Sequence, residues 1–169
     1  MKPTHSWAAL ASDITRESVD NTINALVGVS WAAKPVLVIS SSGGSAEHGF
    51  RLCEYIEGYP KPLTGLVSHT DAKSMAALVL LSCSHRVMVK NAGLHFHHIT
   101  ARVNENASQR VIKMVAEEMR RFEERQIALI KKRTKLNTDY DIRKLLDADR
   151  LMDSDEAFWL GFVDEVVGR

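Results

Sequence analysis

The first hundred residues alternate between two spacings of apolar positions. Val19, Ile23, Leu26 and Val27 recur at helical intervals and mark one face of a helix. The run from Val36 to Ile39 is instead continuously apolar, rich in β-branched residues and too short for a helix, which predicts a buried parallel strand. The same reasoning predicts a first strand near Trp7, further helices over about 46–57 and 74–84, and further strands over about 63–67, 87–89 and 94–97.

Strands that alternate with helices are typical of successive βαβ units. We therefore expect an α/β fold with a mostly parallel sheet covered by helices. The chain has 169 residues, and no linker, repeat or low-complexity segment divides it. Residues 1–169 are accordingly predicted to form one domain.

The pattern changes after position 105, where apolar residues keep a helical spacing for nearly 30 positions. A helix of that length is too long to be covered by one small sheet, so part of it should project and contact another chain. Further helices are expected over about 139–147 and from a cap at Ser154 to Gly161, and Phe162–Val167 should close the chain as a strand. The apolar positions of the long helix are Val111, Met114, Val115, Met119, Phe122, Leu129 and Ile130.

Composition and charge exclude several classes of partner. Hydrophobic residues make up 45% and charged residues 25% of the chain, with a formal net charge of +1. These values are ordinary for a globular protein and give no reason to expect nucleic acid or a membrane as partner. Basic residues gather over 120–133, but acidic residues interleave with them, which favours a solvated, salt-bridged helix face.

The compartment is inferred from the first residues and from the cysteines. The first seven residues lack the apolar core of a signal peptide, and no apolar run approaches the roughly 20 residues of a membrane span. Cys53 and Cys83 both lie among apolar residues in helical patterns, so buried free thiols are expected rather than a disulfide. Together these features favour a cytoplasmic location.

Three short segments carry candidate chemistry, and each lies where a strand ends or a helix begins. The first is Ser40–Ser45 with its glycine pair, the second is Ala72–Ala76, and the third is His95–His98. A glycine pair can offer backbone N–H groups, a serine at a helix start can attack, and a histidine at a strand end can take its proton. The three together are the parts of a serine hydrolase site.

Each segment alone has a simpler interpretation. The glycine pair could be a tight strand-to-helix turn, and Ser74 could be an ordinary helix cap. Alternation places His95 and His97 on one strand face, where they could bind a metal or form a structural pair. Zinc needs a third or fourth ligand, and no further Cys or His pair stands at a supporting spacing. Beside the serine and the glycines, we favour a histidine that acts as a general base.

In this order, the segments resemble the motifs of the proteolytic subunit of the Clp protease, the ClpP-like serine peptidases. Residues 41–45 correspond to the family's Ser-Pro-Gly-Gly-Ser, residues 73–76 to Ala-Ser-Met-Gly, and residues 95–98 to Met-Ile-His-Gln. Asp149-Arg150-Leu151 corresponds to Asp-Arg-Phe, and residues 156–164 end like the family's Glu-Ala and Gly-Leu-Val-Asp. The resemblance extends from about Leu10 to Val167.

The resemblance implies a ClpP/crotonase-like fold of repeated ββα units with a long handle helix, here over about 105–134. It also implies a serine endopeptidase that cleaves peptides or unfolded proteins inside stacked, heptameric homo-oligomeric rings, without metal or cofactor. The implied site consists of the triad Ser74, His97 and Asp149, the oxyanion-hole N–H groups of Gly44 and Met75, and the substrate-binding residues Gly43 and Ser45.

Asp149 is not the only acid at a suitable spacing. His97 follows Ser74 by 23 positions and Asp149 follows His97 by 52, which leaves room for the handle. Asp147, Asp153 and Asp155 could also orient the histidine on spacing alone, and only the register of the motif favours Asp149.

The chain departs from the family pattern at several positions. Lys73 replaces a small residue before the nucleophile, which makes a Ser-Lys dyad a further possibility, Ala76 replaces glycine, and His98-Ile99 replaces Gln-Pro. Because strand one is expected near Trp7, the family's N-terminal segment that engages a ring-shaped ATPase is expected to be missing. An ATPase partner is therefore doubtful.

Three other functions remain open. The first is a phage-type head maturation peptidase, which would cut one partner. The second is a catalytically silent ring or scaffold subunit. The third is a crotonase-type acyl-thioester enzyme, for which the serine–histidine pair is superfluous.

Overall fold

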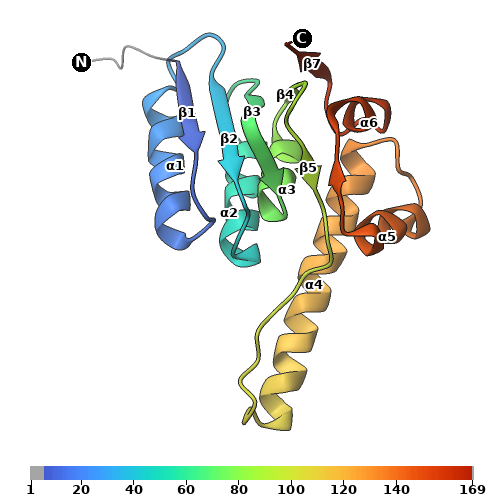
Figure 1. The fold of residues 1–169 in the computed structure, drawn as a ribbon. Coiled ribbons are helices and arrows are strands. Elements are labelled where there is room, and N and C mark those ends of the chain that lie inside the picture. Colours follow the sequence, from blue (N-terminus) through green and yellow to red (C-terminus); the bar gives the residue numbers. More distant parts are fainter. Residues whose placement is uncertain (1–5, 169) are drawn as a thin grey trace.

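Figure 1 shows the fold of the chain in a computed structural model, which describes residues 6–168. Strands and helices alternate through the first half, as the apolar pattern predicts. The elements are β1 (Trp7–Leu10), α1 (Arg16–Gly28), β2 (Val36–Ser41), α2 (Ala46–Glu57), β3 (Thr64–Lys73), α3 (Met75–Ser82), β4 (His85–Val89), β5 (Leu94–His95), α4 (Gln109–Arg133), α5 (Asp139–Ala148), β6 (Leu151–Met152), α6 (Ser154–Trp159) and β7 (Glu165–Val167).

The sheet is mostly parallel, which confirms the predicted fold class. Its main path runs β1-β2-β3-β4-β7, and every neighbouring pair on that path is parallel. The long strand β3 leaves β4 after Val67 and pairs through Ala72 and Lys73 with β5. The short β6 then pairs with β5 in antiparallel orientation. This side branch brings the end of β3, β5 and β6 together.

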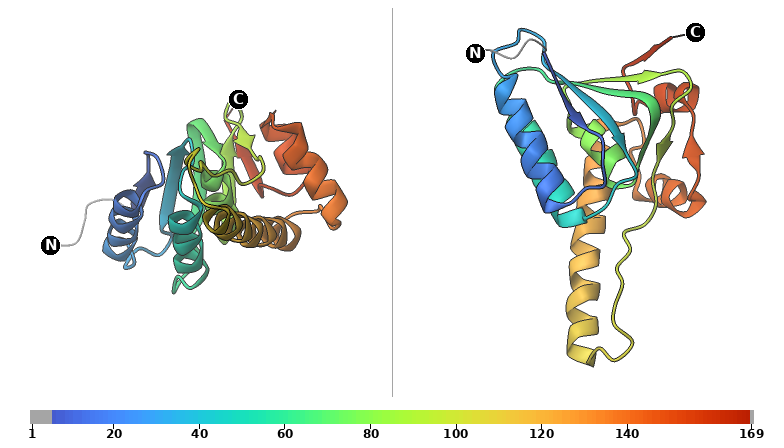
Figure 2. Two further views of the ribbon diagram at one scale, coloured as in Figure 1. Left: turned by 90° about the horizontal axis from the view of Figure 1, so that it is seen from below. Right: turned by 60° about the vertical axis from the view of Figure 1, so that its left-hand side comes forward.

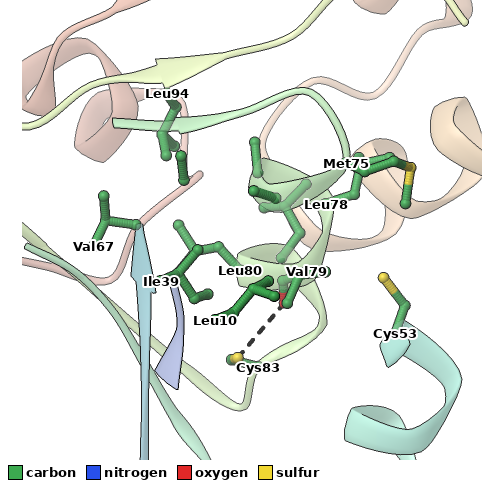
Figure 3. Packing of buried hydrophobic residues seen from close by; sticks show 14 of the residues in the cluster. Leu10, Ile39, Cys53, Val67, Met75, Leu78, Val79, Leu80, Cys83 and Leu94 are labelled. Carbon is green, nitrogen blue, oxygen red and sulfur yellow. Dashed lines mark hydrogen bonds between the residues drawn. The ribbon is translucent and has the colours of Figure 1, made fainter. Parts of the chain in front are cut away.

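Helix α3 is the centre of the core. All eight of its residues are buried, because a helix that is apolar on every side has no face to offer to water. Figure 3 shows side chains of four strands gathered around Leu78 and Leu80 of this helix, namely Leu10, Ile39, Val67 and Leu94. Seen from below in Figure 2, α1, α2 and α4 lie in a row on one side of the sheet.

Helix α4 extends well beyond the rest of the molecule, as the sequence predicts. Among its 25 residues only Gln126, Ile127 and Ile130 are buried, and all three lie in its C-terminal half. The segment between β5 and α4 runs down beside the projecting half and turns back into it (Figure 1). A long helix therefore exists, over Gln109–Arg133 rather than about 105–134, and its role as a handle that contacts another chain stays a prediction.

Several predicted boundaries were wrong. The strand expected over 63–67 continues to Lys73, because its polar second half finds a partner in β5. The strand expected over 94–97 stops at His95, where its pairing with β6 ends. The closing strand starts at Glu165 rather than Phe162, and Phe162 is buried ahead of it.

Two predicted side-chain roles also differ. Val27 is 57% exposed, because α1 contributes Val19, Thr22 and Leu26 to the core instead. Asp153 rather than Ser154 caps α6, through a hydrogen bond from the N–H of Glu156. The hydroxyl of Ser154 is buried and donates to the carbonyl of Lys90 at 2.9 Å.

Both cysteines are free and buried, which confirms that prediction. Burial raises the pKa of the Cys53 thiol and of the Cys83 thiol to about 12, so neither is a nucleophile near neutral pH. The Cys83 thiol donates to the carbonyl of Val79, the bond drawn in Figure 3. Across residues 6–168, none of the helices combines the length and apolarity that a membrane span requires.

Candidate active site

Ser74 occupies a strained turn between β3 and α3. Its backbone has φ 54° and ψ −125°, a conformation that side-chain-bearing residues rarely adopt and that costs on the order of 1–3 kcal/mol. The turn persists because β3 is paired on one side of it and the buried α3 follows on the other. The N–H of Ser74 also donates to the carbonyl of His95 at 2.7 Å. A strained strand-to-helix turn is how α/β hydrolases present a nucleophilic serine.

The glycine pair packs directly against this turn. A Cβ on Gly43, whose φ is 96°, would lie 2.7 Å from the carbonyl oxygen of Lys73 and 2.7 Å from the Cβ of Ser74. Only glycine permits that approach. Gly44 has φ 143°, and a Cβ there would lie 2.5 Å from the carbonyl oxygen of Ile14. Both positions therefore require glycine for reasons of space as well as of backbone conformation.

Ile14 holds the glycine pair in place. Its N–H donates to the carbonyl of Gly43 at 2.7 Å, and its carbonyl accepts from the N–H of Ser45 at 2.9 Å. In such a parallel bridge the N–H of the central residue, Gly44, points away from Ile14. Within residues 6–168 that N–H has no acceptor. It is thus available to a ligand.

The start of α3 supplies a second set of donors. The first N–H groups of α3, those of Met75 and Ala76, have no partner within the helix and lie at the positive end of its dipole. The Cβ that Gly43 lacks would be 3.2 Å from the nitrogen of Met75. The structure therefore brings together the two segments expected to form the oxyanion hole, those of Gly44 and Met75.

Ser45 has structural tasks in this fold. Its hydroxyl accepts from the N–H of His48 at 3.4 Å and so caps α2. Its backbone N–H donates to the carbonyl of Ile14. Its expected contact with substrate stays a prediction.

Lys73 turns toward Asp71 rather than toward Ser74. Its ammonium lies 3.2 Å from the Asp71 carboxylate, and nearly half of the side chain is exposed. The two residues line a shallow polar groove at the carboxyl ends of β2 and β3, together with Ser40, Ser42 and Thr70. This geometry does not favour a Ser-Lys dyad.

The histidine segment keeps two imidazoles side by side. Phe96 is buried and packs on Phe162 with ring centroids 4.9 Å apart, which leaves His95 and His97 on the opposite side of the chain. The rings of His95 and His97 have centroids 5.6 Å apart. The buried amide of Gln126, on α4, donates to the carbonyl of His97 at 3.0 Å and anchors the segment beyond β5.

His97 has the tautomer that a general base requires. Its Nδ1 lies 2.6 Å from the carbonyl oxygen of His98. Because a carbonyl oxygen only accepts, Nδ1 must carry the hydrogen, which leaves Nε2 free to take a proton. Among residues 6–168, however, no hydrogen bond joins His97 to Ser74 or to Asp149.

Asp149 instead binds His95. Its carboxylate Oδ1 lies 2.9 Å from the Nε2 of His95. The backbone of Asp149 is left-handed, with φ 42° and ψ 48°, and the residue ends α5 with two-thirds of its side chain exposed. Asp147, the nearest alternative acid, binds His98 at 2.8 Å. The structure thus brings both expected acids to the histidine segment, and neither to His97.

These positions can be compared with those of a known family. The Clp protease family model matches residues 6–169. The chain belongs to the Clp protease family. The family implies a ClpP-like peptidase, which confirms the resemblance seen in the motifs and agrees with the curled, mostly parallel sheet.

In this member of the Clp protease family, the sequence analysis did not predict three features of the site. They are the strained backbone of Ser74, the buried amide of Gln126, and the pairing of Asp149 with His95. Gln126 could have been noticed in the sequence, because it is a polar residue at an apolar position of the long helix. Nothing in the local sequence signals the other two, because both depend on how β3, β5 and β6 meet.

The three clustered histidines also raised the question of a metal. Within the described part of the chain, no three or more His, Cys, Asp or Glu side chains are grouped so that they could hold an ion. His98 points away from the other two, toward α4 and α5, where it meets Glu123 at 3.1 Å and Asp147 at 2.8 Å.

His98 makes folding dependent on pH. The hydrogen bond to Asp147 raises its pKa above the ordinary value, burial opposes this, and Glu123 raises it further. Protonated His98 therefore stabilises the fold below its ordinary pKa of about 6.5, and this stabilisation is lost as pH rises through the higher folded value. Because the side chain is 37% exposed, we expect a change of only about 0.5 kcal/mol.

Urea unfolding at a series of pH values from about 6 to 8 measures this contribution. The loss of stability with rising pH should be smaller in His98→Gln, which removes the charge. An identical pH dependence in the two proteins would assign it to other groups.

Proposed function

We propose that the chain is a serine endopeptidase. The Ser74 hydroxyl attacks a peptide carbonyl, and Nε2 of His97 accepts its proton and then gives it to the leaving amine as the C–N bond breaks. Water hydrolyses the resulting acyl-enzyme by the same two proton transfers. The N–H groups of Gly44 and Met75 stabilise the oxyanion, and Asp149 stabilises the charged imidazole. No step requires a metal or cofactor.

The turn at Ser74 supports this proposal most directly. The backbone of Ser74, with φ 54°, is unfavourable, and residues strained in this way cluster at active sites. Gly43 lies against the same residue, and the N–H of Gly44 is left without a protein acceptor within residues 6–168. A turn with a purely structural role would not need all three features at once.

The exposed half of α4 supports assembly into rings. Val111, Ile112 and Met114 are 44%, 50% and 60% exposed, near the start of the helix. Apolar side chains in such number on a projecting helix are typical of an interface. We infer that a second copy of the chain covers them, in the stacked and heptameric rings that the family resemblance implies.

Peptides and unfolded chains are the proposed substrates. Their backbones would lie as an added strand beside Gly43–Ser45, which gives low sequence specificity. The buried free thiols agree with a reducing compartment such as the cytoplasm.

Labelling with a fluorophosphonate tests the proposed nucleophile. On the assembled protein we expect a single adduct, which peptide mapping places on Ser74 and which Ser74→Ala abolishes. Ser42→Ala is the matched control, because Ser42 is an exposed serine of the neighbouring loop and its loss should leave the adduct intact. A folded, assembled protein that forms no adduct on Ser74 would contradict the proposal.

One observation favours a second candidate, a catalytically silent ring subunit. Within residues 6–168 neither Ser74 nor Asp149 is hydrogen-bonded to His97. The same labelling decides between the two, because a silent subunit leaves Ser74 unmodified.

A further inference from the structure

The pairing of β5 with β6 stops just short of the expected triad. The antiparallel register joins Leu94 to Met152 and His95 to Leu151. Two further steps of that register would place Asp149 directly opposite His97. Residues directly opposite in an antiparallel pair have Cβ atoms about 4.5–5.5 Å apart, within reach of a hydrogen bond between carboxylate and imidazole.

The ladder ends early because Asp149 adopts a left-handed conformation at the end of α5. Its side chain then reaches the diagonal neighbour, His95, instead of the residue opposite. The Nδ1–H of His97, left without the carboxylate, donates to the carbonyl of His98. One carboxylate thus serves two adjacent imidazoles, of which it can orient only one at a time.

From this geometry we infer that His95 is a positioning residue that competes with His97 for Asp149. The inference rests on the proposed function and adds a resting state to it. In the resting state Asp149 binds His95 and the triad is incomplete. Extending the pairing of β5 with β6 by two residue pairs moves the carboxylate to His97 and completes the triad.

Little else holds Asp149 in either state. Two-thirds of its side chain is exposed, and no second ion pair of its carboxylate occurs within residues 6–168. The neighbouring Arg150 is occupied by Glu156, at 2.7 Å and 2.5 Å. The two imidazole rings are 5.6 Å apart, so the carboxylate has only a short way to move. The occupancy of the two states therefore depends on the backbone of Asp149, which ends the β5–β6 ladder, and on which imidazole binds the carboxylate better.

A double-mutant cycle between His95 and Asp149 tests the competition. The four proteins are the unmodified chain, His95→Met, Asp149→Asn and the double variant. Methionine fills similar space without a nitrogen that could bind Asp149. The readouts are the rate of fluorophosphonate labelling at Ser74 and, with an unstructured fluorogenic peptide, kcat and KM separately.

If His95 holds Asp149 in about nine molecules of ten, His95→Met raises the labelling rate and kcat about tenfold. KM stays unchanged, because His95 competes for Asp149 and not for the peptide. Asp149→Asn then lowers the rate about tenfold more in the His95→Met background than in the unmodified chain. Once Asp149 is lost, His95→Met should no longer change the rate, and closure of the cycle then makes the two factors equal.

The matched control is His98→Gln. The side chain of His98 binds Asp147 and Glu123 rather than Asp149, so its loss should change neither the labelling rate nor the effect of Asp149→Asn. A structural role for His95 would change thermal stability without changing the effect of Asp149→Asn.

Three results would overturn the competition. The first is an equal effect of Asp149→Asn in both backgrounds while Ser74→Ala still abolishes labelling, which leaves the proposed function standing. The second is a folded His95→Met protein that labels more slowly. The third is absence of Ser74 labelling in every variant, which removes the proposed function as well. His95→Leu replaces His95→Met in the cycle if the latter does not fold.

Discussion

Replacing Gly43 by alanine is expected to lower the rate of Ser74 labelling by about 10²–10³, the usual cost of one misplaced oxyanion donor. The new Cβ would meet the carbonyl of Lys73 and the Cβ of Ser74 at 2.7 Å each, so either the glycine loop or the turn must move. Either shift separates the N–H of Gly44 from that of Met75. Alanine at φ 96° adds backbone strain on the order of 1–3 kcal/mol.

The control for this variant is Gly28→Ala. Nothing lies within 4 Å of a Cβ at Gly28, the last residue of α1, so labelling and stability should stay close to those of the unmodified chain. Labelling is measured well below the melting temperature of each protein, which separates loss of chemistry from loss of fold. A folded Gly43→Ala protein that labels at the original rate would show that Gly43 only shapes a turn.

The three candidate segments could be found in the sequence because each stands at an element boundary that the local pattern predicts. The apolar run after Ser74 predicts a buried helix, and the run before the glycine pair predicts a buried strand; both exist. The order of these segments along the chain then matched the order of the motifs in one family. Pattern and order were sufficient for the fold class and for the long helix.

The geometry of the site could not be predicted in the same way. The second half of β3 is polar from Ser68 to Asp71, and it is a strand because β2 and β5 pair with its end at Ala72. The conformation of Ser74 follows from that pairing and from the buried α3. Which histidine receives Asp149 depends on where the β5–β6 ladder stops, and no local propensity encodes that point.

Arg86 illustrates a residue whose role is visible only in three dimensions. In the sequence it is one cation just before a short predicted strand, yet its side chain is only 9% exposed. Its guanidinium donates to both carboxylate oxygens of Asp164, at 3.0 Å and 2.6 Å, and to the carbonyls of Arg133 and Gly161. It therefore ties β4 to the end of α4, to the turn after α6 and to the approach to β7.

Replacing Arg86 by methionine is expected to lower the free energy of unfolding by about 3 kcal/mol. This is the lower end of what removing one member of a buried ion pair costs, because Asp164 keeps about a third of its side chain in water. Two carbonyls also lose their donor. Arg120→Ala is the control: its pair with Glu124 is exposed and separated by one helical turn, so a loss of about 0.5 kcal/mol or less is expected.

The pH dependence of unfolding gives the Arg86 prediction a second readout. Burial alone would raise the pKa of Asp164, but the hydrogen bonds from Arg86 outweigh it and the pKa lies below its ordinary value. Stability from this carboxylate is therefore present above its unfolded pKa of about 3.9 and is lost as pH falls through the folded value.

Urea unfolding at fixed protein concentration, from about pH 6 down to pH 3, should show a smaller acid-induced loss in Arg86→Met than in the unmodified chain. Equal losses in the two proteins would mean that Arg86 does not hold Asp164 ionised. If the ion pair supports the fold rather than the chemistry, Ser74 labelling of the folded variant should match that of the unmodified chain and fail only as the protein melts.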